Sequence, residues 1–333
     1  MSQAFHLEKL PDNVRLSKRL ERMRLSRWGL AAGARLSRWA FGCALIKSEG
    51  RFAYRRAGTT TEIKFNGRNA QYHALYDYNC GYELETGILL ERLARGAGVF
   101  YDVGANWGYF SLLIAAVPEF SGPIYAFEPN PAVFEDLVNC ITQAGLKGRV
   151  TPLNYGVGRV KGELRLELAD SYKSGLGCLR ENGTGIVVPV QSLDGFDLPW
   201  PTIIKIDAEG METAILEGSA QLLREHRPFI VFESFLNFRE PENTRSSLRL
   251  LHAAGYRVFN PTLAFGDPTE PLPTSYGDSL DELLQGNSYP PTMLFPVDEV
   301  TRFLMRPQLN LFACHNERIA ELVSLGFLFR EPR

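Results

Sequence analysis

The stretch that decides the fold is Asp102-Val-Gly-Ala-Asn-Trp-Gly-Tyr-Phe-Ser111. It follows an apolar run, Val99–Val103, that predicts a buried strand, and it opens a segment with the apolar content of a helix. Gly104 and Gly108 allow the backbone to turn tightly and to approach a ligand with no Cβ in the way. Their G-x-x-x-G spacing differs from the G-x-G-x-x-G of dinucleotide-binding turns. Two interpretations of the glycine turn follow: a site for a nucleotide-like ligand, or a tight structural turn.

The chain beyond this stretch alternates between strand-like and helix-like segments. Strand-like runs lie at 123–127, 149–153, 186–190, 202–206, 228–232, 256–259 and 309–313. Helix-like segments lie at 82–95, 108–117, 131–142, 212–225 and 242–254. The alternation predicts an α/β fold with a doubly wound, mainly parallel sheet covered on both faces. In such a sheet the ligand site lies at the carboxyl ends of the strands.

The second predicted strand ends in a carboxylate, in the sequence Glu128-Pro-Asn130. An acidic residue about 20 residues past the glycine turn is placed to accept hydrogen bonds from two ribose hydroxyls. The alternative is that Glu128 caps the helix that starts near Pro131. Together with the glycine turn, Glu128 favours ribose binding.

The segment Ile203–Glu212 carries four charged residues, of which Lys205, Asp207 and Glu209 lie at the end of another strand and Glu212 follows them. In a strand, Lys205 and Asp207 point to the same face. A lysine within an otherwise apolar strand is costly unless it is paired. The group is therefore predicted to supply a base, a substrate anchor or a cofactor contact, or else a purely structural Lys–carboxylate pair. The spacing identifies no third ligand for a metal, and Glu233 is a further carboxylate at a strand end.

Composition places the chain among soluble globular proteins. Of its 333 residues, 45% are hydrophobic and 22% are charged. The longest uncharged stretch near the N-terminus, Trp39–Ile46, is far shorter than the roughly 20 residues that span a bilayer. No signal peptide is recognised, and the five cysteines are scattered without a CxxC pair. These features predict a protein of the reducing cytoplasm and exclude a disulfide framework.

Residues 1–56 form a basic arm, with 13 Lys+Arg against 4 Asp+Glu, whereas the rest of the chain is acidic. Leu, Arg and Ala dominate residues 12–46, which predicts a helix, and Arg-Leu-Ser-Arg-Trp occurs at both 24–28 and 35–39. The 11-residue offset puts both copies on one face. The arm either docks on the body or contacts an anionic membrane or a protein partner. Nucleic acid is disfavoured because the acidic body repels phosphates.

Three parts are predicted from these patterns: the basic amphipathic arm 1–56, a helical lead-in 57–97 and a catalytic core 98–333. Within the core, residues 261–300 hold seven of the twenty prolines of the chain. This insertion follows a strand whose carboxyl end lies on the ligand side if it runs parallel to the sheet. A long irregular loop in that position is usually functional or mobile.

Six motifs in order resemble those of the FkbM-type S-adenosylmethionine-dependent methyltransferases, which have the class I methyltransferase fold. They are Asp102–Ser111, Phe127–Pro131, Asn154–Gly158, Ser192–Asp194, Ile204–Gly218 and Asn310–His315. The resemblance covers roughly residues 80–315 and excludes the arm. It implies a seven-stranded sheet with an antiparallel last strand, and S-adenosyl-L-methionine as the cofactor.

The resemblance also assigns roles to residues. Asp102, Gly104 and Asn106 would face the methionine part of the cofactor, Glu128 the ribose, and Asn154 the neighbourhood of the adenine. Gly108 and Asn130, in the same two turns, complete the predicted cofactor-binding set.

The implied activity is O-methylation of a small-molecule or glycan acceptor, namely a hydroxyl of a sugar or secondary metabolite. Transfer is an in-line displacement that needs the acceptor oxygen at ~3–3.5 Å and a group that removes its proton. Asp207 or Glu209 is the predicted base or acceptor anchor, and Lys205 is their electrostatic partner. The alternatives are a non-catalytic cofactor-binding scaffold at a membrane or complex and, against the glycine spacing, an NAD-dependent dehydrogenase.

Overall fold

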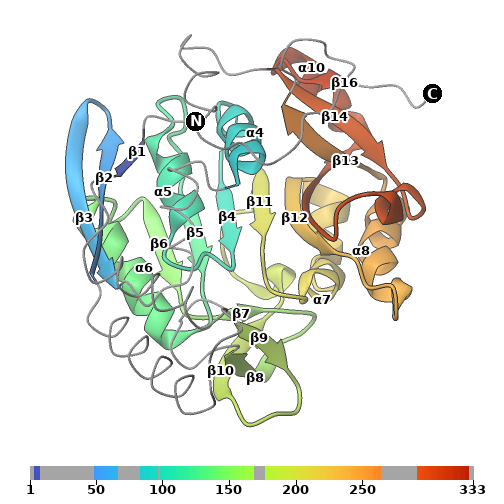
Figure 1. The fold of residues 1–333 in the computed structure, drawn as a ribbon, viewed down its shortest axis with the longest axis horizontal. Coiled ribbons are helices and arrows are strands. Elements are labelled where there is room, and N and C mark those ends of the chain that lie inside the picture. The colour runs from blue at the N-terminus through green and yellow to red at the C-terminus, as the bar shows by residue number, and fades with distance from the viewer. Residues whose placement is uncertain are drawn as a thin grey trace, which may run out of the picture.

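The computed structural model describes residues 4–7, 49–66, 83–96, 98–168, 177–263 and 291–329. Its centre is a nine-stranded sheet in the order β16-β14-β13-β15-β12-β11-β4-β5-β6 (Figure 1). The bounds of these strands are β4 Phe100–Val103, β5 Ile124–Phe127, β6 Val150–Leu153, β11 Ile203–Ile206, β12 Phe229–Phe235, β13 Tyr256–Leu263, β14 Thr292–Val297, β15 Gln308–His315 and β16 Leu328–Phe329.

The five strands β12, β11, β4, β5 and β6 run parallel to one another, and β15 lies antiparallel between β12 and β13. The predicted α/β fold with a large, mainly parallel sheet is confirmed. The count of seven strands was too small, because β14 and β16 extend the edge beyond β13. The sequence did not indicate these strands because residues 261–300 are rich in proline, which usually argues against a strand. Pro261 is tolerated because it lies in the part of β13 that pairs only with β14.

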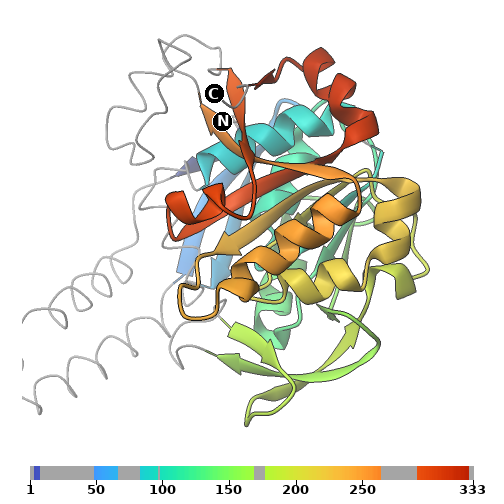
Figure 2. The same cartoon turned by 90° about the vertical axis from the view of Figure 1, so that its right-hand side faces the viewer.

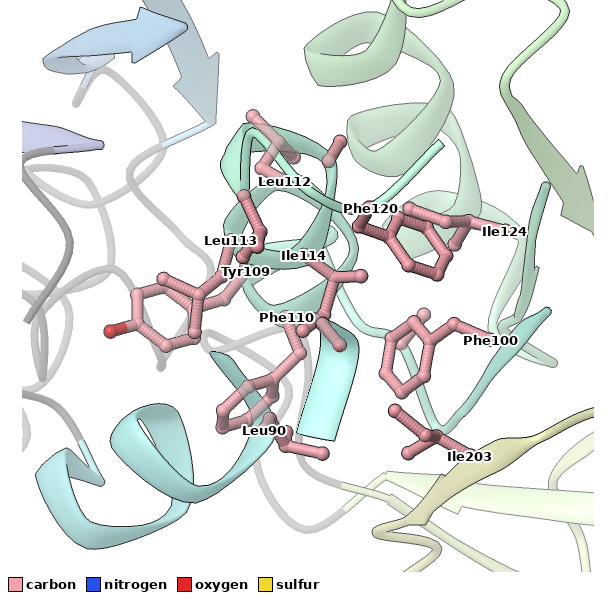
Figure 3. Packing of buried hydrophobic residues seen from close by; sticks show 14 of the residues in the cluster. Leu90, Phe100, Tyr109, Phe110, Leu112, Leu113, Ile114, Phe120, Ile124 and Ile203 are labelled. Carbon is pink, nitrogen blue, oxygen red and sulfur yellow. The ribbon is translucent and has the colours of Figure 1, made fainter. Parts of the chain in front are cut away.

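Helices cover both faces of the sheet, as Figure 2 shows. One apolar core joins that sheet to α4, α5 and α6, and a second joins it to α7, a single turn of π-helix and α8. Figure 3 shows the first core, in which Phe110 and Ile114 of α5 pack near Phe100 and Ile203 of the sheet. The helices are α4 Leu84–Ala94, α5 Tyr109–Ala116, α6 Pro131–Gln143, α7 Glu212–Glu217, the π-helix Leu222–His226, α8 Pro241–Ala253 and α10 Ile319–Ser324.

A separate four-stranded sheet, in the order β7-β10-β8-β9, fills the connection between β6 and β11. Its strands are β7 Gly156–Val157, β8 Gly162–Leu168, β9 Gly177–Arg180 and β10 Ile186–Gln191. The predicted strand 186–190 is therefore real, but it belongs to this sheet and not to the central one. In Figure 1 the small sheet lies below the lower ends of β4 and β11.

The described N-terminal part is a three-stranded sheet of β1 Phe5–Leu7, β2 Glu49–Arg56 and β3 Thr59–Asn66. The sequence had indicated no strand here, and the helix predicted over 12–46 lies outside the described residues. The rings of Phe52 and Phe65 lie 5.3 Å from Trp107 of the glycine turn, centroid to centroid. The three-part division of the chain stays a prediction.

In the part of the chain that the structure describes, no helix is both long enough and apolar enough to cross a membrane.

Gly104→Ala tests the tightest backbone contact. Gly104 has φ +76°, and a Cβ there would lie 1.7 Å from the carbonyl oxygen of Asp207. Gly145 is the matched control, since it has φ +66° and no atom within 4 Å of a Cβ. Gly145→Ala should lower the free energy of unfolding by about 1–2 kcal/mol, the cost of a left-handed alanine. Gly104→Ala should lower the free energy of unfolding by more than about 4 kcal/mol. Urea denaturation measures both values, and an equal loss of stability in the two variants would contradict the close contact at Gly104.

Candidate functional site

The glycine turn joins the carboxyl ends of β4, β5 and β11. The amides of Gly104 and Ala105 both donate to the carbonyl of Phe127, at 3.0 and 2.9 Å. The amide of Asp207 donates to the carbonyl of Val103. Asn106 and Gly108 adopt left-handed backbone conformations, with φ 52° and 96°. The turn therefore presses closely against two neighbouring strand ends, and α5 begins directly after it.

Asp102 lies beneath this turn and is 1% exposed. The hydroxyl of Ser111 donates to its Oδ2 at 2.6 Å, while its Oδ1 has no hydrogen-bond partner among the described residues. Burial raises the pKa of Asp102, against the opposing effect of the Lys205 ammonium. Asp102 supports the turn from below and does not itself line the cleft described next.

Glu128 accepts hydrogen bonds from two backbone amides, Asn106 N at 2.9 Å and Asn130 N at 2.8 Å. Burial raises its pKa to about 7, and these two hydrogen bonds oppose the shift. A carboxylate has about four lone-pair directions, so two remain for a ligand. The interpretation of Glu128 as the cap of α6 was wrong, because Asn130 is the cap: its Oδ1 accepts from Ala132 N at 3.1 Å.

Asn154 secures the same strand end. Its side-chain amide donates to the carbonyls of Glu128 and Pro129, at 2.8 and 3.2 Å. Asn154 therefore positions the Glu128 loop, and neither it nor Gly108 lines the cleft.

Lys205 forms a buried ion pair with Asp207, with 2.6 Å between Nζ and Oδ2. Its ammonium also lies 4.4 Å from the centre of the Phe110 ring, a cation–π contact. Burial alone would lower the pKa of Lys205, but the carboxylates of Asp207, Glu83 and Asp102 outweigh it and raise the pKa. Lys205 is therefore a permanent cation that fixes the orientation of Asp207.

Glu209 lies at the exposed rim of the same loop, with φ 49°. A left-handed conformation is uncommon for a residue other than glycine. Desolvation of its carboxyl group, followed by the charges of Asp207 and Glu212, raises its pKa to about 7. Glu212 stabilises the loop by accepting from the amides of Ala208 and Gly210. Glu209 has no hydrogen bond to any described residue.

A cleft that is partly open to solvent lies between these strand ends and the small sheet. Six predicted site residues line it: Gly104, Asn106, Glu128, Asn130, Asp207 and Glu209. Three carboxylates line the cleft, and among the described lining residues there is no lysine or arginine.

The opposite wall of the cleft was predicted only in part: the sequence put the neighbours of Asn154 near the adenine and the loop Ser171–Gly185 in a wall of the acceptor pocket. It is apolar and comes from Tyr155, Val157, Leu166 and Leu179. Leu166 and Leu179 belong to the small sheet, which the sequence pattern had merged with the central one. The alternation of β8, whose Leu166 is buried between an exposed Arg165 and a half-buried Glu167, was the available signal.

Glu233, near the end of β12, is also buried. The side-chain amide of Gln308 donates to its Oε1, and its Oε2 has no partner among the described residues. Burial, followed by the charges of Asp207 and other carboxylates, raises its pKa to about 9. Within the residues described, no group of three or more His, Cys, Asp or Glu is arranged to hold a metal ion.

Comparison with known proteins agrees with this geometry. Residues 102–258 match the family model of the methyltransferase FkbM domain. Hexuronic acid methyltransferase AglP of Haloferax volcanii is 28% identical over 140 residues, which are 41% of this chain and 56% of that protein. The match thus spans little more than half the length of this relative.

Solved structures show weaker similarity. The methyltransferase FkbM from Methylobacillus flagellatus KT is 17% identical, with a TM-score of 0.36 over 56% of this chain and 49% of that one. A SAM-dependent O-methyltransferase from Thermotoga maritima is 14% identical, with a TM-score of 0.40 over 84% and 79% of the two chains.

Residues 102–258 are thus an FkbM-type methyltransferase domain, and the family predicted from the six motifs is confirmed. S-adenosyl-L-methionine is the cofactor of that family.

Glu233→Gln tests the electrostatic state of the site through protein stability. The folded protein keeps a proton on Glu233 up to a pH of about 9, whereas an unperturbed glutamate has a pKa of 4.5 and releases its proton far earlier. The unfolded state therefore binds fewer protons in this window, and stability falls as pH rises. Glu233→Gln should reduce the loss of Tm between pH 6 and 8.5. Glu242→Gln, at an exposed position, is the control and should leave the dependence of Tm on pH unchanged. If Glu233→Gln also showed the wild-type dependence of Tm on pH, the raised pKa of Glu233 would be contradicted.

Proposed function

We propose that the protein is an S-adenosylmethionine-dependent O-methyltransferase that acts on a hydroxyl of a sugar or secondary metabolite. The observation that carries the proposal is the cleft itself. It combines a carboxylate held by two backbone amides, an apolar wall and a strand-end acid group, with no cation among the described lining residues.

The cleft fits the cofactor part by part. Glu128 has free lone pairs for the two ribose hydroxyls, and such charge-assisted hydrogen bonds are about twice as strong as neutral ones. Leu166 and Leu179 offer apolar surface to an adenine ring. Gly104 lines the cleft, and its lack of a Cβ lets the turn approach the backbone of Asp207. When bound, the sulfonium centre supplies an activated methyl group.

The charge of the cleft favours this cofactor over a nicotinamide dinucleotide. A dinucleotide brings a pyrophosphate with two negative charges, which require backbone amides or cations. Here Glu128, Asp207 and Glu209 would repel it. A sulfonium centre is positively charged, so the same carboxylates attract it. The dehydrogenase alternative is therefore disfavoured by charge as well as by glycine spacing.

Glu209 is the residue best suited to act as the base. Its carboxyl group lines the cleft, and its pKa of about 7 is close to the pH at which a general base works best. Asp207 is already paired with Lys205, so we assign it to anchoring the acceptor hydroxyl and Lys205 to positioning Asp207. A cofactor-binding scaffold would have no use for this arrangement.

The acceptor class rests on similarity and chemistry together. The name of the Haloferax relative describes a methyltransferase for a hexuronic acid, which supports a sugar as the acceptor. Contact of residues 12–46 with a membrane or partner, and a cytoplasmic location, remain predictions from the sequence.

Glu128→Gln should weaken binding of S-adenosyl-L-methionine about ten- to a hundredfold at pH 8, the equivalent of a lost charged hydrogen bond of ~1.5–3 kcal/mol. Wild-type affinity should fall as pH drops through about 7, because protonation removes the carboxylate acceptor. The variant should lack this pH dependence. Titration calorimetry at pH 6 and 8 measures both effects, with the exposed Glu135→Gln on α6 as control. Unchanged affinity in Glu128→Gln would remove Glu128 from the site.

Glu209→Gln should lower kcat about 10²–10⁴-fold, the usual contribution of a general base, and should weaken cofactor binding less than Glu128→Gln does. Wild-type kcat should rise with pH through about 7 as Glu209 loses its proton. Asp207→Asn should raise the KM for the acceptor more than it lowers kcat. Turnover is followed by mass spectrometry as label moves from S-adenosylmethionine to an acceptor in cell extract. Full activity in Glu209→Gln would exclude it as the base.

A further inference from the structure

A row of polar side chains crosses the sheet beside the cleft. Lys205 pairs in register with Val231 of β12, so Glu233, two residues further along that strand, shares its face. Asp207, just past the end of β11, lies on this face too, because it pairs with Lys205. Glu233 lies directly opposite Asn310 of β15. This row therefore extends from the proposed acceptor anchor Asp207 to the amino end of an antiparallel strand.

Two buried oxygen atoms in this row lack hydrogen bonds. Glu233 is 7% exposed, and its Oε2 has no partner among the described residues. The Nδ2 atom of Asn310 donates to Glu83 Oε2 at 2.9 Å. The Oδ1 atom of Asn310 has no hydrogen-bond partner among the described residues. A buried polar group left unsatisfied costs about 1–3 kcal/mol, so two opposite each other require an explanation. Hydroxyl groups of a ligand would satisfy both.

The row is supported by a fully buried arginine. Arg302 donates from Nε to the hydroxyl of Ser234 at 2.9 Å, and from Nη2 to the carbonyls of Ser234 and Pro307 at 2.6 and 3.1 Å. These bonds join Ser234, which follows Glu233, to Pro307, which precedes Gln308. The side chain of Gln308 in turn donates to Glu233 Oε1. Glu233 and Asn310 are thus presented on a fixed frame, as a binding site requires.

The charge of this region decides which ligand it accepts. Asp207, Glu209 and Glu212 lie close enough to Glu233 to raise its pKa. The two cations described beside this row are both engaged: Lys205 is paired with Asp207, and Arg302 donates to Ser234, Arg306 and Pro307. A ligand carboxylate would have to lose its hydration beside these acids, which is strongly unfavourable.

We infer that Glu233 and Asn310 bind adjacent hydroxyls of the acceptor, and that this acceptor is an uncharged, hydroxyl-rich sugar and not a uronate. The inference rests on the proposed function and narrows its substrate class. It sets this protein apart from the relative whose name specifies a hexuronic acid.

The test compares methyl α-glucoside, methyl α-galactoside and methyl α-mannoside with methyl α-glucuronide as acceptors for the full chain. Formation of S-adenosylhomocysteine gives kcat/KM, and calorimetry gives the affinity for S-adenosyl-L-methionine. For at least one neutral glycoside, kcat/KM should be at least tenfold higher than for the glucuronide. Glu233→Ala and Asn310→Ala should each lower kcat/KM for it at least tenfold, with cofactor affinity within twofold.

Glu233→Gln provides the second variant, since it keeps the shape and the hydrogen-bonding capacity of the protonated carboxyl group. It should use the neutral glycoside with a kcat/KM within about threefold of the wild-type value, in contrast to Glu233→Ala. Equal or better use of the glucuronide, no use of any neutral glycoside, or unchanged kinetics in both alanine variants would overturn the inference. Failure to bind S-adenosyl-L-methionine at all would instead defeat the proposed function.

Discussion

The contact between Gly104 and the carbonyl of Asp207 is the constraint on which the site depends. It sets the carboxyl ends of β4 and β11 so close together that even one methyl group has no room. The same turn binds the end of β5 through the carbonyl of Phe127. Because three strand ends are fixed against one another, Glu128, Asp207 and Glu209 face a common cleft. The chemistry of each carboxylate then follows from its local partners.

These partners give three carboxylates three different states. Glu128 accepts two amides and is buried, Asp207 is neutralised by Lys205, and Glu209 is unpaired within the described residues. Burying so many acids in one place is costly in the absence of a ligand, because each desolvated carboxylate opposes the next. A positively charged cofactor relieves that cost, which explains how an acidic cleft is compatible with a stable fold.

The sequence was most informative where local rules act. Glycine spacing and strand-end carboxylates predicted Gly104, Glu128 and Asp207, since parallel strands bring their carboxyl ends to one edge. It was least informative where distant segments meet. Asn310 lies opposite Glu233 only because β15 runs antiparallel to β12, and Leu179 lines the cleft only because the β6–β11 connection folds into its own sheet. Neither pairing leaves a signal in the spacing of residues near the glycine turn.

The packing of Trp107 makes residues upstream of the glycine turn part of the same folding unit. Its ring lies against Phe52 and Phe65, so the indole of the glycine turn is covered by a hairpin some forty residues upstream in the chain. A fragment cut to the family match at 102–258 would lose this cover, and it would also lose β15 from the middle of the sheet. The similarity to the family therefore marks out residues 102–258, whereas autonomous stability requires segments on either side of them.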